Sequence, residues 1–162
     1  MKKLVIFYSL DGNTKFISEN IAQEIGADIL ELKPLKEITR NNFMKMFSGG
    51  KQAILKSEPE IQPFDIDPLS YDLIFIGTPV WAWTFAPALR TFFKYNKIEN
   101  KNIGLFCCHG GGPGKIFEKM EEELEGNRIL GKLDFKDPLR QEKEKDAVDA
   151  KKWASDIVEI IG

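Results

Sequence analysis

Residues 3–14 read KLVIFYSLDGNT, a short apolar run that passes directly into small and polar residues. A continuous apolar run of this length is typical of a β-strand buried on both faces of a sheet. Helical spacing follows at once, because Ile17, Ile21 and Ile25 fall four residues apart and Gly26 comes next as a helix stop. The stretch therefore predicts a buried strand, a tight loop and a helix, which is the repeating unit of parallel α/β sheets.

The same alternation continues along the chain. Strands are expected at 3–8, 28–33, 72–77, 102–108 and 127–135, and helices at 14–25, 86–95, 114–124 and 143–161. This order predicts an α/β fold in one domain spanning 1–162, a doubly wound five-stranded parallel sheet of strand order 2-1-3-4-5 with helices on both faces. The stretch 34–71 is long for a connection, holds a possible helix near 41–55, and is a candidate cover over a site.

Composition excludes several classes of protein. Of the 162 residues, 43% are hydrophobic and 30% are charged, with a net charge of −2, so global disorder and a strongly basic nucleic-acid binder are excluded. No apolar run approaches the roughly 18 residues of a membrane span. The apolar run near the N-terminus has no small-residue cleavage site behind it, so we expect a cytoplasmic protein that binds neither membranes nor nucleic acid.

The two cysteines, Cys107 and Cys108, are adjacent in the sequence. A bridge between neighbours would be strained, and no second cluster of ligands completes a zinc site. We therefore expect two small side chains at a strand end, with no disulfide and no metal.

Ligands of open parallel sheets bind beyond the carboxyl ends of the strands, where three loops have unusual compositions. The first loop leads into a helix N-terminus, whose free N–H groups favour anions. Gly12 allows a sharp turn, and Ser9, Asn13 and Thr14 add hydroxyl and amide donors. These residues suit a phosphate cradle, although Asn13 or Thr14 acting only as a helix cap would fit the same pattern.

The second loop, which follows the strand at 72–77, carries Trp81 and Trp83. Tryptophans are not ordinary turn residues, and a large flat ligand that stacks on them would explain their presence. Rings that plug the top of the core, or that cover a dimer contact, would fit the same pattern.

The third loop, 109–115, reads HGGGPGK. Its glycines expose backbone groups that can bind the edge of a heterocycle, although a flexible connection would have the same composition. The loop matches neither the P-loop pattern nor the dinucleotide-binding glycine pattern. His109 is a candidate hydrogen-bond or proton donor, or else a solvent-facing loop residue. Together the three loops predict a site for a phosphorylated aromatic heterocycle.

Three segments resemble the flavodoxin family, in its short-chain form. They are FYSLDGNTKFISENIA (7–22), DLIFIGTPVWAWTFAPALRTFF (72–93) and IGLFCCHGGGPGK (103–115), and their order and spacing fit the family over nearly the whole chain. The resemblance implies non-covalent FMN. It assigns the phosphate to Ser9, Leu10, Asp11, Gly12, Asn13 and Thr14, the ribityl chain and ring to Thr78, Pro79, Val80, Trp81, Ala82 and Trp83, and the other edge of the ring to Cys108, His109, Gly110, Gly111 and Gly112.

The resemblance further implies an electron-transfer protein that serves redox partner proteins as a monomer or homodimer. The alternative is an FMN-dependent oxidoreductase that oxidises NAD(P)H and reduces a quinone or another small acceptor. A phospho-receiver with a related sheet is disfavoured, because Thr78 stands where that class needs an Asp.

Overall fold

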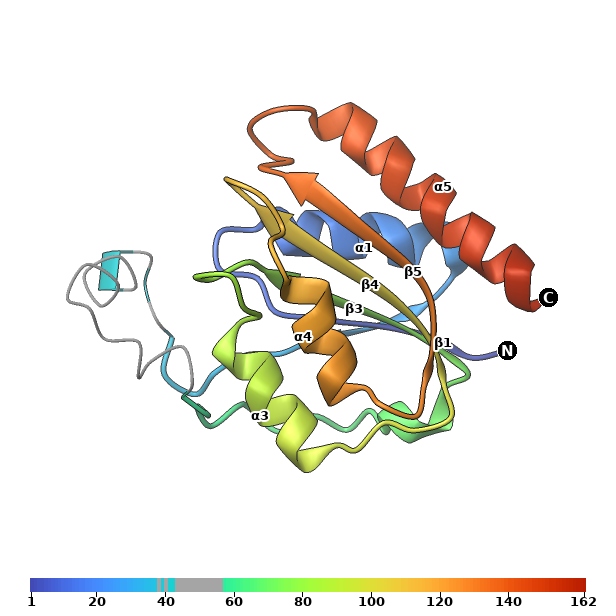
Figure 1. Ribbon diagram of the computed structural model, residues 1–162, viewed down its shortest axis with the longest axis horizontal. Coiled ribbons are helices and arrows are strands. Elements are labelled where there is room, and N and C mark those ends of the chain that lie inside the picture. Colours follow the sequence, from blue (N-terminus) through green and yellow to red (C-terminus); the bar gives the residue numbers. More distant parts are fainter. Residues whose placement is uncertain (38, 40, 43–56) are drawn as a thin grey trace.

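A computed structural model describes residues 1–37, 39, 41–42 and 57–162 (Figure 1). Its five strands form one parallel sheet of order β2-β1-β3-β4-β5, so the predicted fold and strand order are confirmed. The strands are β1 (Lys3–Phe7), β2 (Asp28–Glu31), β3 (Leu73–Pro79), β4 (Asn102–His109) and β5 (Arg128–Lys136). The helices are α1 (Asn13–Ile25), α3 (Pro87–Tyr95), α4 (Ile116–Glu123) and α5 (Lys143–Ile161), with a short 3-10 helix at Pro68–Ser70.

The connection between β2 and β3 is described only in part. The possible helix near 41–55 lies outside the described residues except at positions 41 and 42. Within the described part of the chain, no helix is both long enough and apolar enough to cross a membrane.

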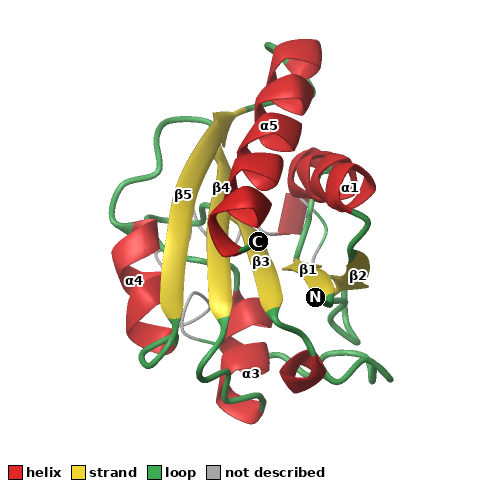
Figure 2. Cartoon of the chain, turned by 90° about the vertical axis from the view of Figure 1, so that its right-hand side faces the viewer, coloured by secondary structure: helices red, strands yellow, loops and turns green. Residues whose placement is uncertain are grey.

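Helices cover both faces of the sheet (Figure 2), and each face has its own apolar core. Alternate strand residues divide between the cores, so Leu4 of β1 faces α3 and α4 while Val5 faces α1 and α5. The predicted stripe of α1 is buried throughout, with Ile17 and Ile21 fully inaccessible. Burial on both faces is why the central strands are continuous apolar runs.

Two glycines within the sheet make room for aromatic rings. An added Cβ at Gly77 of β3 would lie 2.2 Å from Cζ of Phe106, and one at Gly104 of β4 would lie 2.8 Å from the Phe75 ring. Both rings also pack edge-on against Trp153 of α5. Glycine at these positions therefore allows the aromatic rings beneath α5 to pack closely against the sheet.

Candidate functional site

The carboxyl ends of β1, β3 and β4 bring the three predicted loops to one edge of the sheet (Figure 1). The second and third loops are joined directly, because the Val80 N–H donates to the Cys108 carbonyl at 2.9 Å. The Trp83 ring also lies over Gly114, where an added Cβ would approach its Cδ1 to 3.1 Å. The predicted segments thus form one continuous surface at the switch point of the sheet.

The first loop turns sharply at Gly12, whose φ of 95° lies in the left-handed region. Side chains of the loop bind its own amides: the Ser9 Oγ accepts from the Gly12 N–H, and the Asp11 Oδ1 accepts from the Asn13 N–H, both at 3.2 Å. Leu10 is half-buried against the α3 side of the core. The first turn of α1 lies immediately behind this loop.

Neither Asn13 nor Thr14 caps α1. The Asn13 Oδ1 accepts instead from the Leu139 N–H at 3.0 Å, in the connection between β5 and α5. The Thr14 side chain is buried, and its Oγ1 has no hydrogen-bond partner among the groups that the structure describes. Its neighbour is the Cys108 thiol, a weak hydrogen-bonding group. The capping interpretation of these residues is therefore wrong, and Thr14 retains unused hydrogen-bonding capacity.

The second loop is closed from within by Thr78, which is fully buried in β3. Its hydroxyl donates to the Pro79 carbonyl at 2.9 Å and accepts from the Ala86 N–H at 3.0 Å. The first hydrogen bond lies at the end of β3, and the second joins β3 to the residue before α3. Thr78 thus fixes the shape of the loop, while Pro79 ends the strand.

A tight turn separates the two tryptophans. Trp81 and Thr84 exchange backbone hydrogen bonds of 2.9 and 3.0 Å around Ala82 and Trp83, whose φ values are 46° and 63°. Residues with side chains rarely adopt this left-handed region, so the turn stores strain, which is typical of functional sites.

The turn sends the two indoles to different environments. Trp81 is 5% exposed and meets Tyr8 edge-to-face, with ring centroids 5.5 Å apart. Trp83 is 69% exposed. Trp81 is therefore part of the core, as in the interpretation that the ring plugs the top of the core. Trp83 is the tryptophan available to a ligand.

The third loop begins at His109, whose side chain is 7% exposed. Its Nε2 lies 2.7 Å from Oδ2 of Asp134 on the neighbouring strand β5. Its Nδ1 is buried and, within the described ranges, has no hydrogen-bond partner. His109 is thus an anchored residue at the strand end and not a solvent-facing one.

The glycines beyond His109 leave the loop surface open. Nothing lies within 4 Å of the Cβ positions of Gly111 and Gly112, and Gly110 approaches only the Asp137 carboxylate, at 3.6 Å. A flat ligand placed against Gly111 and Gly112 would therefore meet backbone.

A fourth segment, 137–142, joins the site and was not predicted. It lies between β5 and α5, and Leu139 contributes both the amide bound by Asn13 and a methyl group 3.4 Å from the Cβ position of Gly12. The contact spans 126 residues of sequence, so no local pattern announces it. The only sequence signal is Leu139 itself, an apolar residue within a charged stretch.

A cavity of about 190 Å³ lies on the other side of the first loop, at the carboxyl ends of β1 and β2. Its lining includes Tyr8, Leu10, Glu31, Lys33 and Glu37. Burial raises the pKa of Tyr8 to about 12, with smaller contributions from the negative charges of Glu37 and Asp11. The tyrosine is therefore a neutral hydroxyl at physiological pH.

The cysteines are not a reactive centre. Both are buried, and burial raises the pKa of each thiol well above its ordinary value. A thiol that stays protonated is a poor nucleophile. Within the part of the chain that the structure describes, no group of three or more metal-ligating side chains occurs either.

A family model described as flavodoxin matches residues 2–155. The chain belongs to the flavodoxin family. The expected membership of the flavodoxin family is thereby confirmed.

Relatives of this flavodoxin-family chain agree with the assignment. BilS of Clostridioides difficile (strain CD3), a flavodoxin-like domain-containing protein, is 29% identical over 137 residues, or 81% of this chain and 63% of that protein. The chain thus spans less than two thirds of that relative's length. A flavoprotein from Lactobacillus acidophilus NCFM, solved in complex with FMN, is 28% identical with a TM-score of 0.65, over 88% of this chain and 97% of the other.

A solved structure from Bacteroides eggerthii DSM 20697 has a TM-score of 0.77 at 21% identity, over 97% of this chain and 98% of that one. This likeness shows the flavodoxin fold alone.

Proposed function

We propose that this flavodoxin-family chain binds FMN non-covalently at the carboxyl edge of its sheet and transfers electrons between redox partner proteins. The observation that carries the proposal is Trp83, an indole 69% exposed on a strained turn and held beside the glycine loop. An exposed aromatic ring in a strained backbone is costly unless it serves a contact. The FMN complex of the Lactobacillus acidophilus relative supports an isoalloxazine ring as that contact.

The first loop fits the phosphate of this ligand. Gly12 brings the backbone to the N-terminus of α1, where N–H groups and the helix dipole favour an anion. Thr14 adds a buried hydroxyl with no other partner among the described residues. The phosphate-binding set is Ser9, Leu10, Asp11, Gly12, Asn13 and Thr14.

The second and third loops fit the ring from its two sides. Trp83 offers an apolar face, with Val80 and Ala82 beside it, while Gly110, Gly111 and Gly112 offer backbone. His109 and Cys108 form the buried base of the third loop, and the Val80–Cys108 hydrogen bond fixes the spacing of the two walls. Trp81 and Thr78 support the second loop from beneath.

When bound, FMN supplies the one- and two-electron redox chemistry of its ring. The chain's own residues bind and orient it and exclude water from its inner edge. The thiols take no part in electron transfer, because both are buried and protonated.

A second candidate function is an FMN-dependent oxidoreductase that oxidises NAD(P)H and reduces a quinone or another small acceptor. The observation that favours it is the cavity of about 190 Å³ beside the first loop, whose polar lining suits a small second ligand. An electron carrier remains the stronger proposal, because neither Trp83 nor the glycine loop is among the residues that line this cavity, so a ligand bound there would not lie against the ring.

The first experiment mixes the purified protein with FMN, removes free ligand by ultrafiltration and records the visible spectrum of the retained protein. A retained, perturbed flavin band is expected, and a colourless protein would refute the proposed cofactor. Steady-state NAD(P)H consumption with a quinone then separates the two functions. Negligible turnover is expected of a carrier, whereas robust turnover identifies the oxidoreductase.

A further inference from the structure

The carboxylate of Asp11 lies in the loop that the proposed function assigns to the flavin phosphate. Its Oδ1 accepts from the Asn13 N–H at 3.2 Å, and that amide is the first of α1. Amides at a helix N-terminus are the groups that bind a phosphate anion. Asp11 therefore uses, with a negatively charged oxygen, a donor that the phosphate needs.

Asp11 differs in kind from the other side chains of this loop. The hydroxyl of Ser9 accepts the Gly12 N–H, but it also carries a proton that it can donate to a phosphate oxygen. The Thr14 hydroxyl likewise can donate, and it has no other partner within the described ranges. An ionised carboxylate only accepts hydrogen bonds, so the side chain of Asp11 cannot donate to a phosphate and can only compete with it. The place of Asp11 in the phosphate-binding set therefore rests on its backbone.

Other acids also lie near the loop. Burial raises the pKa of Cys108, the adjacent Thr14 hydroxyl opposes the rise, and the carboxylates of Asp11, Asp146 and Asp137 reinforce it. These three acids thus act on a group directly beneath the loop. The nearest basic residue along the chain, Lys15, pairs with Glu31 at 3.4 Å.

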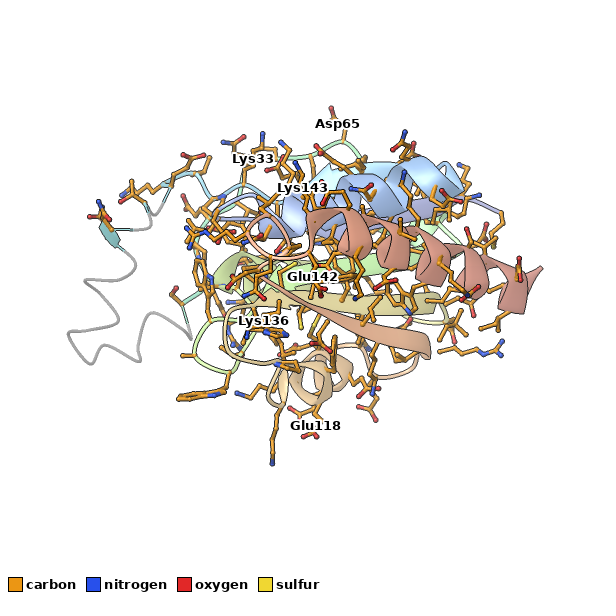
Figure 3. The ribbon with its side chains drawn as sticks, turned by 90° about the horizontal axis from the view of Figure 1, so that it is seen from above. Lys33, Asp65, Glu118, Lys136, Glu142 and Lys143 are labelled. Carbon is orange, nitrogen blue, oxygen red and sulfur yellow. The ribbon has the colours of Figure 1, made fainter. Side chains whose placement is uncertain are left out.

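Basic side chains also flank the fourth segment, but acids accompany them. Lys136 and Lys143 bracket this segment (Figure 3), which itself carries Arg140, and the Lys143 Nζ lies 5.4 Å from the centroid of the Phe16 ring on α1. Glu142 pairs instead with Lys145 at 3.7 Å. Acids and bases thus both surround the loop, and Asp11 is the acid that accepts directly from an amide at the start of α1.

We infer that Asp11 is a built-in competitor of the flavin phosphate and thereby sets the preference of the site between phosphorylated and unphosphorylated flavin. This inference rests on the proposed function. Two like charges at contact distance repel strongly even near a protein surface. Binding of FMN must move the carboxylate off the Asn13 amide, whereas riboflavin carries no phosphate and leaves it in place.

The consequence is an FMN that exchanges readily. The ring contacts contribute the same affinity to both flavins, while the phosphate contributes less than its donors alone would allow. Bound FMN is then in faster exchange with free flavin than it would be with a neutral residue at position 11.

The experiment measures dissociation constants for FMN and for riboflavin by quenching of flavin fluorescence. It compares the unaltered protein with Asp11→Asn, Asp11→Ala and the control Asp65→Asn. Asp11→Asn removes the charge and keeps an oxygen that can accept from the Asn13 amide. Asp11→Ala also removes the acceptor. Asp65→Asn removes one charge from an exposed residue outside the loop.

We expect Asp11→Asn to tighten FMN binding by about tenfold, because one unit of charge beside a dianion is lost. Asp11→Ala should tighten it at least as much. Riboflavin binding should change by less than about twofold in both variants, and Asp65→Asn should change neither ligand. The difference in FMN affinity between Asp11→Asn and the unaltered protein should become smaller as salt is added, since screening weakens the repulsion between the carboxylate and the phosphate.

Two results would overturn the inference while leaving the proposed function intact. One is unchanged FMN affinity in both Asp11 variants. The other is an equal tightening of FMN and riboflavin, which would point to a general change in the loop. Absence of binding of either flavin, in every variant, would refute the proposed function and the inference with it.

Discussion

Replacing Gly77 with alanine tests whether the core beneath the site is as tightly packed as the structure indicates. The added methyl group would lie 2.2 and 2.3 Å from two carbons of the Phe106 ring, where carbon atoms normally approach to about 3.5–4.0 Å. The ring must therefore move by more than an ångström. It is fully buried and packs edge-on against Trp153, with centroids 6.4 Å apart, so no free space receives it.

Overpacking of this kind costs about 1–3 kcal/mol, and the severity of the contact places Gly77→Ala at the upper end, near 3 kcal/mol. That is a large share of the roughly 5–15 kcal/mol that stabilises a typical domain. Urea unfolding should show a lower midpoint with an unchanged slope.

Gly111→Ala is the matched control, because nothing lies within 4 Å of its Cβ position and its φ is not positive. It should alter the free energy of unfolding by less than about 0.5 kcal/mol. A second substitution, Phe106→Leu, should recover part of the loss in Gly77→Ala, since the smaller side chain yields space. Equal stability of Gly77→Ala and Gly111→Ala would refute the packing argument.

Three further predictions concern the site. Trp83→Ala should weaken FMN binding by about 1 kcal/mol or more in a fluorescence titration. Trp81→Ala should instead lower the free energy of unfolding by about 3 kcal/mol, as loss of a core ring does. Weaker binding in Trp81→Ala with lower stability in Trp83→Ala would contradict the roles given to the two indoles. Asn13→Ala should lower the free energy of unfolding in urea by about 1 kcal/mol, because the Leu139 N–H loses its acceptor. Asn13→Asp should keep that hydrogen bond and instead weaken FMN binding through its charge. Equal losses of stability in the two variants would count against the contact between Asn13 and Leu139. The pKa of Tyr8 is raised from 10.0 to about 12, so the folded state keeps a proton that the unfolded state loses, and the free energy of unfolding should fall as pH rises across this interval. Unfolding measured at several pH values should show a smaller fall in Tyr8→Phe than in the unaltered protein. An identical fall in both would show that Tyr8 is not the cause.

The fold was predictable because its main signals are local. The five buried or half-buried strands and the spacing of Ile17, Ile21 and Ile25 can be read from short windows of sequence. The order 2-1-3-4-5 then follows from alternation of strands and helices, which admits few topologies.

The details of the site were less accessible, because distant contacts determine them. Nothing in the sequence near Asn13 indicates that its side chain binds Leu139. The turn at Ala82 and Trp83 lacks the Gly or Asn that normally marks left-handed backbone, so propensity argues against the conformation found. The sequence could place two tryptophans at the site, but only the fold separates the buried one from the exposed one.

We propose that two features of this edge act in opposite directions on a flavin. Trp83 offers an apolar face whose contribution does not depend on the charge of the ligand, whereas Asp11 opposes the ligand's phosphate. Stronger stacking would therefore raise the affinity for FMN and riboflavin together, and only a change in the first loop would alter the ratio of the two affinities. Because the two groups lie on different loops, each acts on the ligand through its own part of the molecule. We therefore expect retention of the cofactor and choice of the cofactor to be set by different residues, so that a substitution can alter one without the other.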